Sequence, residues 1–325
     1  MRLLTILSIL LAVAAAALWL VLFRPFLAYP LPADLVCLDE AEGETKPLAP
    51  PRLVYGLGLS YAGHIAESPG LYDPETGPPV FRKRSHAVNF GDEILYPSRQ
   101  VLLDGVRHID PDHAADLAES FPEIPALLDY EVEIGLAVLE DISRADLARP
   151  DFVPPVGYFL ANDVTARILI GMAPRFDQTV AYLAEGKGLP GFLPVGERLW
   201  VPREARPDSW LCVELRTTVN GKLRQSAPSE NIIVGPRAIL AGVAERLGLA
   251  GFEAGDWVIT GTPPGVASQV PGWLQRALAL IDPSAETKLG LMIGGAASDP
   301  AYLRPGDVVT VSAGVLGSKS SRIVR

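Results

Sequence analysis

Two glutamates placed two residues apart give the first indication of chemistry in this sequence. Glu131 and Glu133 lie in a stretch that reads DYEVEI from residue 129. On a strand, side chains alternate between the two faces, so both carboxylates lie on one face and Val132 and Ile134 on the other. Burial of two like charges costs on the order of several kcal/mol without compensation. The pair therefore indicates either a solvent-facing strand edge or a bound cation.

A third carboxylate favours the cation. Asp163 follows the apolar run at residues 156–160, at the end of a predicted strand, where functional groups often collect. Three carboxylates with open coordination positions suit Mg²⁺, Mn²⁺ or Ca²⁺, whereas softer metals prefer His or Cys. The acidic residues thus favour a site for a hard cation.

A histidine and a glutamate three residues apart could act together as a general base. On a helical turn His64 and Glu67 share a face. A carboxylate beside an imidazole fixes its tautomer and raises its basicity, as activation of a water molecule requires. Similar pairs also occur on protein surfaces without a catalytic role, so the spacing alone leaves both interpretations open.

Two loops hold further polar candidates. Lys187 is the single cation in a segment rich in Gly and Pro at residues 186–196. Thr262 lies in the segment GTPPGV, which predicts a rigid turn that could aim Thr262 and nearby backbone N–H groups at an anion. A surface lysine and a purely structural turn would explain these two segments equally well.

Eight segments resemble, in the same order along the chain, segments of the fumarylacetoacetate hydrolase family. They read GLSYAGHIAE, PPVFRK, DYEVEIGLAV, GYFLANDVTAR, KGLPGFLPVG, VNGKLRQ, GDWVITGTPPGV and LRPGDVV, and together they cover most of residues 52–325. Any one segment is a loose match. The combination of DYEVE, NDVTAR, a single lysine segment and TGTPPGV is specific, and it resembles this family closely.

The resemblance implies roles for particular residues. It implies that Mg²⁺ or Mn²⁺ is held by three carboxylates, those of Glu131, Glu133 and Asp163. It implies a base dyad on a lid, His64 with Glu67, and a substrate contact from Lys187. Three further positions match family positions near the substrate, namely Lys83, Gln225 and Thr262. The resemblance also implies a mixed β-sandwich roll and a homodimer.

The activity implied by the resemblance is hydrolysis of a C–C bond in an acylpyruvate-like or related 2-oxo acid or diketone. The metal would polarise the carbonyl, His64 oriented by Glu67 would take a proton from water, and Lys187 would stabilise the developing negative charge. Decarboxylation, hydration or isomerisation of a similar 2-oxo acid is the alternative within the family. A catalytically inactive, membrane-tethered scaffold is the alternative of another class, which the retained charged residues disfavour.

Several departures from the family pattern leave the substrate open. Ile168 stands where an Asp often follows the arginine that matches Arg167, and Ser60 replaces a frequent Asn. Two connections are longer than usual, at residues 98–128 and 267–300, and the first of them contains His108 and His113. They could form lid, partner or membrane-facing elements.

The elements that must position these residues are mostly strands. The clearest is predicted at residues 210–219, where apolar and polar residues alternate before the hairpin signal Asn220-Gly221. Shorter strands are predicted at 53–57, 130–138, 156–160, 256–260 and 307–311. One helix is predicted from Pro236 to a C-cap at Gly248. The pattern indicates a strand-rich α+β fold with a few helices.

The N-terminus predicts a membrane anchor. Residues 3–23 are apolar and uncharged, and 21 residues are long enough for a helix to cross a bilayer. A cleaved signal peptide is the alternative, because Ala14–Ala17 could supply a cleavage site. We therefore expect a transmembrane anchor or signal peptide at 1–24, a spacer rich in Pro and acidic residues at 25–51 and a catalytic domain at 52–325, with the side of the membrane undetermined.

Composition excludes some partners. A formal net charge of -10 and a pI near 5.0, without clusters of Lys and Arg, argue against nucleic-acid binding, so the partner is expected to be a small molecule. Cys37 and Cys212 lie far apart and form no CxxC motif, so neither a disulfide framework nor a zinc site is indicated.

Overall fold

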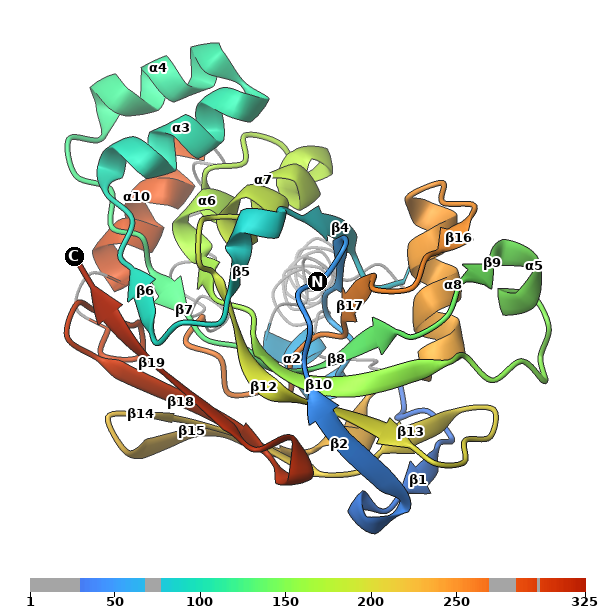
Figure 1. The fold of residues 1–325 in the computed structure, drawn as a ribbon. Coiled ribbons are helices and arrows are strands. Elements are labelled where there is room, and N and C mark those ends of the chain that lie inside the picture. Colours follow the sequence, from blue (N-terminus) through green and yellow to red (C-terminus); the bar gives the residue numbers. More distant parts are fainter. Residues whose placement is uncertain (1–29, 68–76, 269–284, 297–298) are drawn as a thin grey trace, which may run out of the picture.

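The architecture consists of two larger β-sheets flanked by helices (Figure 1). The computed structural model describes residues 30–67, 77–268, 285–296 and 299–325. The eight-stranded sheet has the order β2 (Gly43–Pro47), β12 (Leu193–Pro202), β10 (Val156–Asn162), β8 (Val132–Val138), β17 (Trp257–Ile259), β3 (Val54–Leu57) and β4 (Val80–Lys83), with β5 (Val88–Asn89) beside β12. Its pairs are antiparallel except β17 with β3 and β12 with β5.

A second sheet of five strands packs against the first. Its order is β15 (Lys222–Pro228), β14 (Glu214–Val219), β18 (Val308–Ala313), β19 (Ser318–Val324) and β6 (Glu93–Leu95). Three smaller pairs join β1 (Val36–Leu38) to β13 (Ser209–Leu211), β7 (Leu128–Asp129) to β11 (Thr165–Ala166) and β9 (Ile142–Ser143) to β16 (Gly251–Phe252). The described residues thus form the strand-rich α+β fold that the sequence predicted.

The helices lie in two groups around the sheets. One group gathers on one side (upper left in Figure 1) and contains α3 (Arg99–Ile109), α4 (Pro111–Ser120), α6 (Arg167–Gly171), α7 (Thr179–Lys187) and α10 (Ala285–Ala296). On the other side lie α5 (Arg144–Leu147) and α8 (Pro236–Arg246), and α2 (Ala62–Glu67) follows β3. Short 3-10 turns complete the elements: η2 (Glu40–Glu42), η3 (Ser85–Ala87), η4 (Phe176–Gln178), η5 (Ser229–Asn231) and η6 (Gly314–Leu316).

Local sequence explains the long insertion at residues 98–128. Ser98 caps the first helix by accepting a hydrogen bond from the N–H of Val101, and Asp110 caps the second by accepting from that of His113. Pro111 occupies the first turn of α4, where its missing N–H costs nothing. The insertion is therefore a helical hairpin, and α3 packs against α7.

Both faces of the central strands β8 and β10 are buried. On one face Leu136 and Leu160 belong to a hydrophobic cluster with Leu215 and Val311 of the five-stranded sheet. On the opposite face Phe159 belongs to a second cluster, which reaches Leu183 of α7. Burial on two sides explains why these strands are nearly continuous apolar runs in the sequence.

The strand predicted at residues 210–219 divides into two. β13 ends at Leu211, β14 begins at Glu214, and the two strands belong to different sheets. The hairpin turn is confirmed, because Asn220 and Gly221 have φ angles of 50° and 76°, the left-handed conformations that a type I′ turn requires. The helix predicted from Pro236 is α8, and Gly248 with φ of 63° follows it.

The predicted spacer at residues 25–51 contains ordered structure. β1 pairs with β13, β2 pairs with β12, and Cys37 forms a disulfide with Cys212. The spacing of these cysteines did not indicate a disulfide framework, and this bond corrects that interpretation. Their separation of 175 residues hides the pair in the sequence, whereas the parallel register of β1 and β13 places Cys37 opposite Trp210, two residues before Cys212.

The prediction of a membrane protein is also corrected. In the part of the chain that the structure describes, no helix is long and apolar enough to cross a bilayer. The described structure therefore gives no support for the predicted transmembrane helix and membrane location. The segment that suggested them, residues 3–23, lies outside the described residues.

Reduction of the Cys37–Cys212 disulfide is expected to lower the melting temperature. The bond joins residues 175 apart, and the entropy of closing a loop of this length predicts a stabilisation of about 5 kcal/mol, or roughly 10 °C. Thermal unfolding with and without a phosphine reductant measures this effect. The Cys37→Ser/Cys212→Ser variant should match the reduced protein and should not respond to the reductant. Equal melting temperatures for oxidised and reduced wild type would contradict the prediction.

Candidate metal centre and active site

Three buried carboxylates meet at the ends of two neighbouring strands. Glu131 precedes β8, Glu133 lies within it, and Asp163 directly follows β10. Because β8 and β10 are antiparallel, the start of one lies beside the end of the other, and the N–H of Asp163 donates to the carbonyl of Glu131 at 2.9 Å. One oxygen from each of the three carboxylates lies within 4.8 Å of the other two, and each residue is at most 3% exposed. The structure thus brings the three predicted ligands together.

Two buried lysines compensate part of this negative charge. The ammonium of Lys187 lies 2.6 Å from Glu131 Oε2 and 2.7 Å from Asp163 Oδ2. Lys83, the last residue of β4, pairs with the other oxygen of Asp163. Lys187 was predicted to lie in a loop, but it is the last residue of α7. A helix end therefore fixes where its side chain enters the cluster.

Arg167 and Asp129 extend the cluster on its other side. The Arg167 guanidinium lies 2.8 Å from Asp129 Oδ2 through Nε and 2.5 Å from Glu131 Oε1 through Nη2. Asp129 also accepts hydrogen bonds from the N–H groups of Ala267 and Ser268, at 2.7 and 3.1 Å. The sequence analysis assigned no role to this ion pair. The available signal was the charged residue Asp129 at the start of DYEVE and Arg167 at the end of NDVTAR.

The charges determine which carboxyl groups are ionised. Burial alone would raise the pKa of Glu131, but the charges of Lys187 and Arg167 outweigh it and hold that pKa below its usual range. Burial, and then the charge of Asp163, raise the pKa of Glu133 well above its usual value. Of these two glutamates, Glu133 is therefore the one that more readily holds a proton when no metal is bound.

Burial also affects the pKa of the two lysines. Burial lowers the pKa of Lys83, although the charge of Asp163 opposes this effect. Burial acts in the same direction on Lys187, but the charges of Asp163 and Glu131 outweigh it and raise its pKa. Lys187 is therefore the more firmly protonated of the two lysines.

The donor set fits a hard divalent cation. Its members are all carboxylate oxygens, and no Cys or His takes part in the cluster among the described residues. Four buried carboxylates, counting Asp129, face the three cations Lys83, Lys187 and Arg167. A proton on Glu133 would balance this set, and a divalent cation that displaced that proton would leave a net positive charge. Such a site favours an anionic ligand.

The predicted base dyad is formed beside this cluster. His64 Nδ1 lies 3.2 Å from Glu67 Oε2 on α2, and the N–H of Gly265 donates to Glu67 Oε1 at 2.8 Å. His64 is 4% exposed, and its charge contributes to the lowered pKa of Glu131, which places the imidazole within electrostatic reach of the carboxylates. Glu67 is thus fixed by the segment that contains Thr262, and it fixes His64 in turn. Movement of α2 as a lid stays a prediction.

Gln225 and Thr262 brace the strand that holds the glutamates. Gln225 Oε1 accepts from the N–H of Val132 at 3.2 Å, and Thr262 Oγ1 donates to the carbonyl of Val132 at 2.9 Å. Gln225 Nε2 donates to Thr262 Oγ1 at 2.8 Å, and the N–H of Gly261 donates to Glu133 Oε2 at 2.8 Å. These bonds fix the residue between the two glutamates. Contact of Gln225 or Thr262 with substrate stays a prediction.

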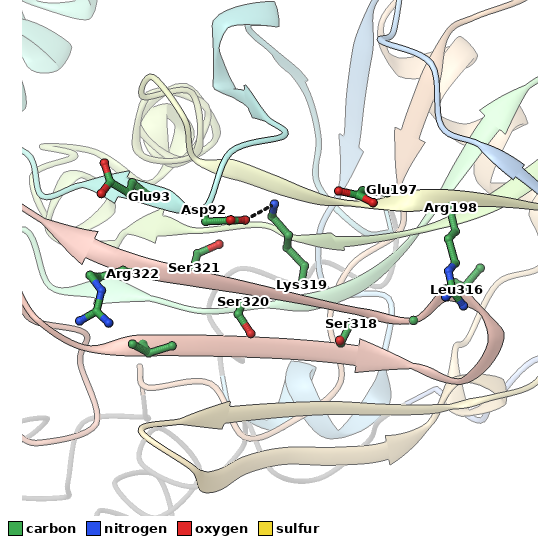
Figure 2. Close-up of a pocket in the computed structure, with 12 residues that line it drawn as sticks. Asp92, Glu93, Glu197, Arg198, Leu316, Ser318, Lys319, Ser320, Ser321 and Arg322 are labelled. Carbon is green, nitrogen blue, oxygen red and sulfur yellow. Dashed lines mark hydrogen bonds and ion pairs between the residues drawn. The ribbon is translucent and has the colours of Figure 1, made fainter.

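A surface cavity of about 600 Å³ lies elsewhere, between β12, β19 and the segment before β6 (Figure 2). Figure 2 shows the ion pair between Lys319 and Asp92 on its wall, with Glu197 and Arg198 on the facing strand. None of its lining residues belongs to the acidic cluster or to the base dyad. The cavity is therefore separate from the candidate metal centre.

Comparison with known proteins agrees with this geometry. Residues 53–324 match the family model described as fumarylacetoacetate (FAA) hydrolase C-terminal. An oxaloacetate tautomerase of Bacillus subtilis (strain 168) is 28% identical, over 74% of this chain and 66% of that protein. A mitochondrial oxaloacetate tautomerase of Schizosaccharomyces pombe is 30% identical, over 69% of this chain and 86% of that protein.

A hydrolase and a solved structure are also similar. The 2,4-didehydro-3-deoxy-L-rhamnonate hydrolase of Sphingomonas sp. (strain SKA58) is 29% identical, over 72% of this chain and 70% of that protein. The crystal structure of fumarylpyruvate hydrolase from Pseudomonas aeruginosa, in complex with Mn²⁺ and pyruvate, has a TM-score of 0.55 at 20% identity. It covers 92% of this chain and 98% of that one, and at this identity it supports the fold alone.

Glu133→Gln is expected to stabilise the metal-free protein at pH 8. Because the pKa of Glu133 is higher in the folded protein, its carboxyl group ionises at a lower pH in the unfolded chain. Above the unfolded pKa near 4.5, ionisation of Glu133 therefore favours the unfolded chain and lowers the stability of the fold. Gln cannot ionise, so the gain in the free energy of unfolding that the substitution gives in EDTA should grow with pH and vanish near pH 4. Saturation with Mn²⁺ at about 100 times Kd should stabilise wild type by about 2.7 kcal/mol but not the variant. Thermal unfolding measures both effects, and a less stable variant in EDTA at pH 8 would contradict the assignment.

Arg167→Gln should strongly destabilise the fold. The change removes the buried cation paired with Asp129 and one of the two paired with Glu131, and breaking such a pair costs about 3–5 kcal/mol. Arg216→Gln is the matched control, because Arg216 pairs with Glu214 at the surface and the change should cost within about 0.5 kcal/mol. Urea unfolding compares the two free energies. A loss in Arg167→Gln as small as that expected for Arg216→Gln would show that the buried network is not needed for stability.

Proposed function

Because the chain belongs to the fumarylacetoacetate hydrolase family, we propose that it is a divalent-metal enzyme that forms and stabilises the enolate of a 2-oxo acid. The reaction proposed is hydrolysis of a C–C bond in an acylpyruvate-like substrate. The observation that carries the proposal is one arrangement: three buried carboxylates beside a histidine that a glutamate orients. Glu131, Glu133 and Asp163 would hold Mg²⁺ or Mn²⁺.

The net charge of the site supports an anionic substrate. Once a divalent cation replaces the Glu133 proton, positive charge exceeds negative charge among the buried groups. A bound metal ion supplies Lewis acidity toward the carbonyl and carboxylate oxygens of a 2-oxo acid. The expected partner is therefore a small 2-oxo acid, and the homodimer stays a prediction.

His64 is the proposed general base. Its Nδ1 faces Glu67, so the proton on that nitrogen is held by the carboxylate and Nε2 is free to accept a proton from water or from the carbon next to the carbonyl. Gly265 fixes Glu67 through its N–H, which limits rotation of the dyad. His64 thus combines an oriented tautomer with a position near the carboxylates.

Lys187 is the proposed electrostatic partner of the substrate. Its ammonium lies between Glu131 and Asp163 and stays protonated, because those carboxylates raise its pKa. A protonated lysine at this place would stabilise negative charge that develops on the substrate oxygen during proton transfer. Lys83, whose pKa burial lowers, is the more readily deprotonated neighbour.

Tautomerisation of oxaloacetate is the second candidate. It is favoured by the similarity to two oxaloacetate tautomerases, one from Bacillus subtilis and one from Schizosaccharomyces pombe. The same base and the same cluster would serve, since the keto and enol forms interconvert by proton transfer next to the carbonyl. No water molecule needs activation in this reaction.

The Mn²⁺-loaded full-length chain distinguishes these reactions. With acetylpyruvate, NMR should show acetate and pyruvate in equal amounts if the enzyme is a C–C hydrolase. With oxaloacetate, keto–enol exchange faster than the Mn²⁺ blank indicates a tautomerase, and pyruvate without acetate indicates a decarboxylase. Absence of each of these activities in a folded, Mn²⁺-binding protein would contradict the proposed function.

His64→Asn should lower kcat by about 10²- to 10⁴-fold, because the general base is lost. Mn²⁺ affinity should be unchanged, since His64 is not among the carboxylate ligands. His108→Asn is the matched control: His108 lies on α3, its side chain is 58% exposed, and its nearest acidic partner is Glu185. Steady-state kinetics and calorimetry measure these quantities. Full activity in His64→Asn would exclude His64 as the base.

A further inference from the structure

A β-bulge singles out Arg224 in the five-stranded sheet. In the pairing of β14 with β15, Gln225 lies opposite Thr217 and Leu223 lies opposite Thr218, so Arg224 is the extra residue of β15. Bulges bend a strand and re-aim the side chain of the extra residue, and they are frequent next to active sites. Gln225, the next residue, already braces the strand that holds the glutamates.

Arg224 lies beside the base dyad. Its carbonyl oxygen would be 2.5 Å from a Cβ at position 265, so only Gly allows the close approach of the two backbones, and Gly265 has φ of 104°. The N–H of the same Gly265 donates to Glu67. Burial and then the charge of Asp129 raise the pKa of Tyr130, and the charge of Arg224 opposes them while Glu67 adds to them. The Tyr130 hydroxyl is thus within electrostatic reach of both residues.

The guanidinium of Arg224 has no carboxylate partner among the described residues. Its Nη2 donates to the carbonyl of Pro300 at 3.3 Å, and its buried Nε has no hydrogen-bond partner in the described part of the chain. The charge of Asp299 also raises the pKa of Tyr130. One oxygen of Asp299 accepts a hydrogen bond from the N–H of Ala301, and among the described residues Asp299 forms no ion pair with Arg224. The three cations of the cluster, Lys83, Lys187 and Arg167, are each paired with carboxylates.

We propose that Arg224 binds a second carboxylate at the far end of the substrate, so that the site selects 2-oxo diacids over 2-oxo monoacids. This inference rests on the proposed function of the same site. A guanidinium binds a carboxylate through two parallel N–H groups, and Nε with one Nη is the pair that this geometry requires. The unpartnered Nε of Arg224 supplies the first of these donors.

Matched ligand pairs test the proposal by calorimetry on the Mn²⁺-loaded full-length chain. 2-Oxoglutarate and 2-oxopentanoate have five carbons and differ only in a terminal carboxylate or methyl group, and 2-oxoadipate and 2-oxohexanoate form the six-carbon pair. Wild type should bind at least one diacid about 10- to 100-fold more tightly than its monoacid, the range expected for a hydrogen-bonded charged group. Arg224→Gln should abolish that preference and leave monoacid affinity unchanged.

Two further variants separate the charge from structural effects. Arg224→Lys should keep part of the preference, because an ammonium retains the charge but not the two parallel donors. Arg216→Gln, on the surface of the neighbouring strand β14, should bind all four ligands as wild type does. A similar loss in Arg216→Gln and Arg224→Gln would indicate damage to the sheet and overturn the proposal.

The outcomes distinguish this inference from the proposed function. If wild type binds diacid and monoacid equally, or if Arg224→Gln keeps the preference, the subsite at Arg224 is excluded while the 2-oxo-acid site stands. If Mn²⁺ binds but none of the four ligands does, the proposed function fails and the subsite fails with it.

Discussion

Burial of four carboxylates in one place is the constraint on which the rest of this structure depends. Asp129, Glu131, Glu133 and Asp163 are each at most 3% exposed, so water cannot solvate their charges. The fold supplies three cations, and burial raises the pKa of the remaining carboxyl group, Glu133, so that it favours the protonated form. Burial of these charges is costly, and the three clustered carboxylates could hold a metal ion that offsets part of this cost.

The topology explains how residues distant in sequence reach this cluster. The antiparallel pairing of β8 with β10 brings Glu131 beside Asp163, while Lys83 comes from the end of β4 and Lys187 from the end of α7. Backbone N–H groups of residues 261–268 then bind Glu133, Glu67 and Asp129. One short segment therefore holds a metal-ligand candidate, the base dyad and the outer ion pair in a fixed relation, which couples positioning of the dyad to that of the cluster.

A second set of contacts, on the side of the N-terminal strands, supports the helix that carries the base dyad. Cys212 is flanked by Leu211 and Val213, and Ser229 Oγ donates to the carbonyl of the first and accepts from the N–H of the second. The carbonyl of Ser229 accepts from the hydroxyl of Tyr61, which directly precedes α2. The disulfide-linked strand β1 is thus part of the scaffold on which His64 is held.

The sequence by itself determined the local features: strand alternation, the Asn220-Gly221 turn, helix α8 and the spacing that places Glu131 and Glu133 on one face, because these depend on neighbouring residues. Its resemblance to a family predicted the carboxylate set and the dyad. Only the tertiary structure decided that Arg167 joins the cluster and that the cysteines pair. Such contacts join separate segments whose approach depends on sheet order and register, and these leave no periodic signal in the chain.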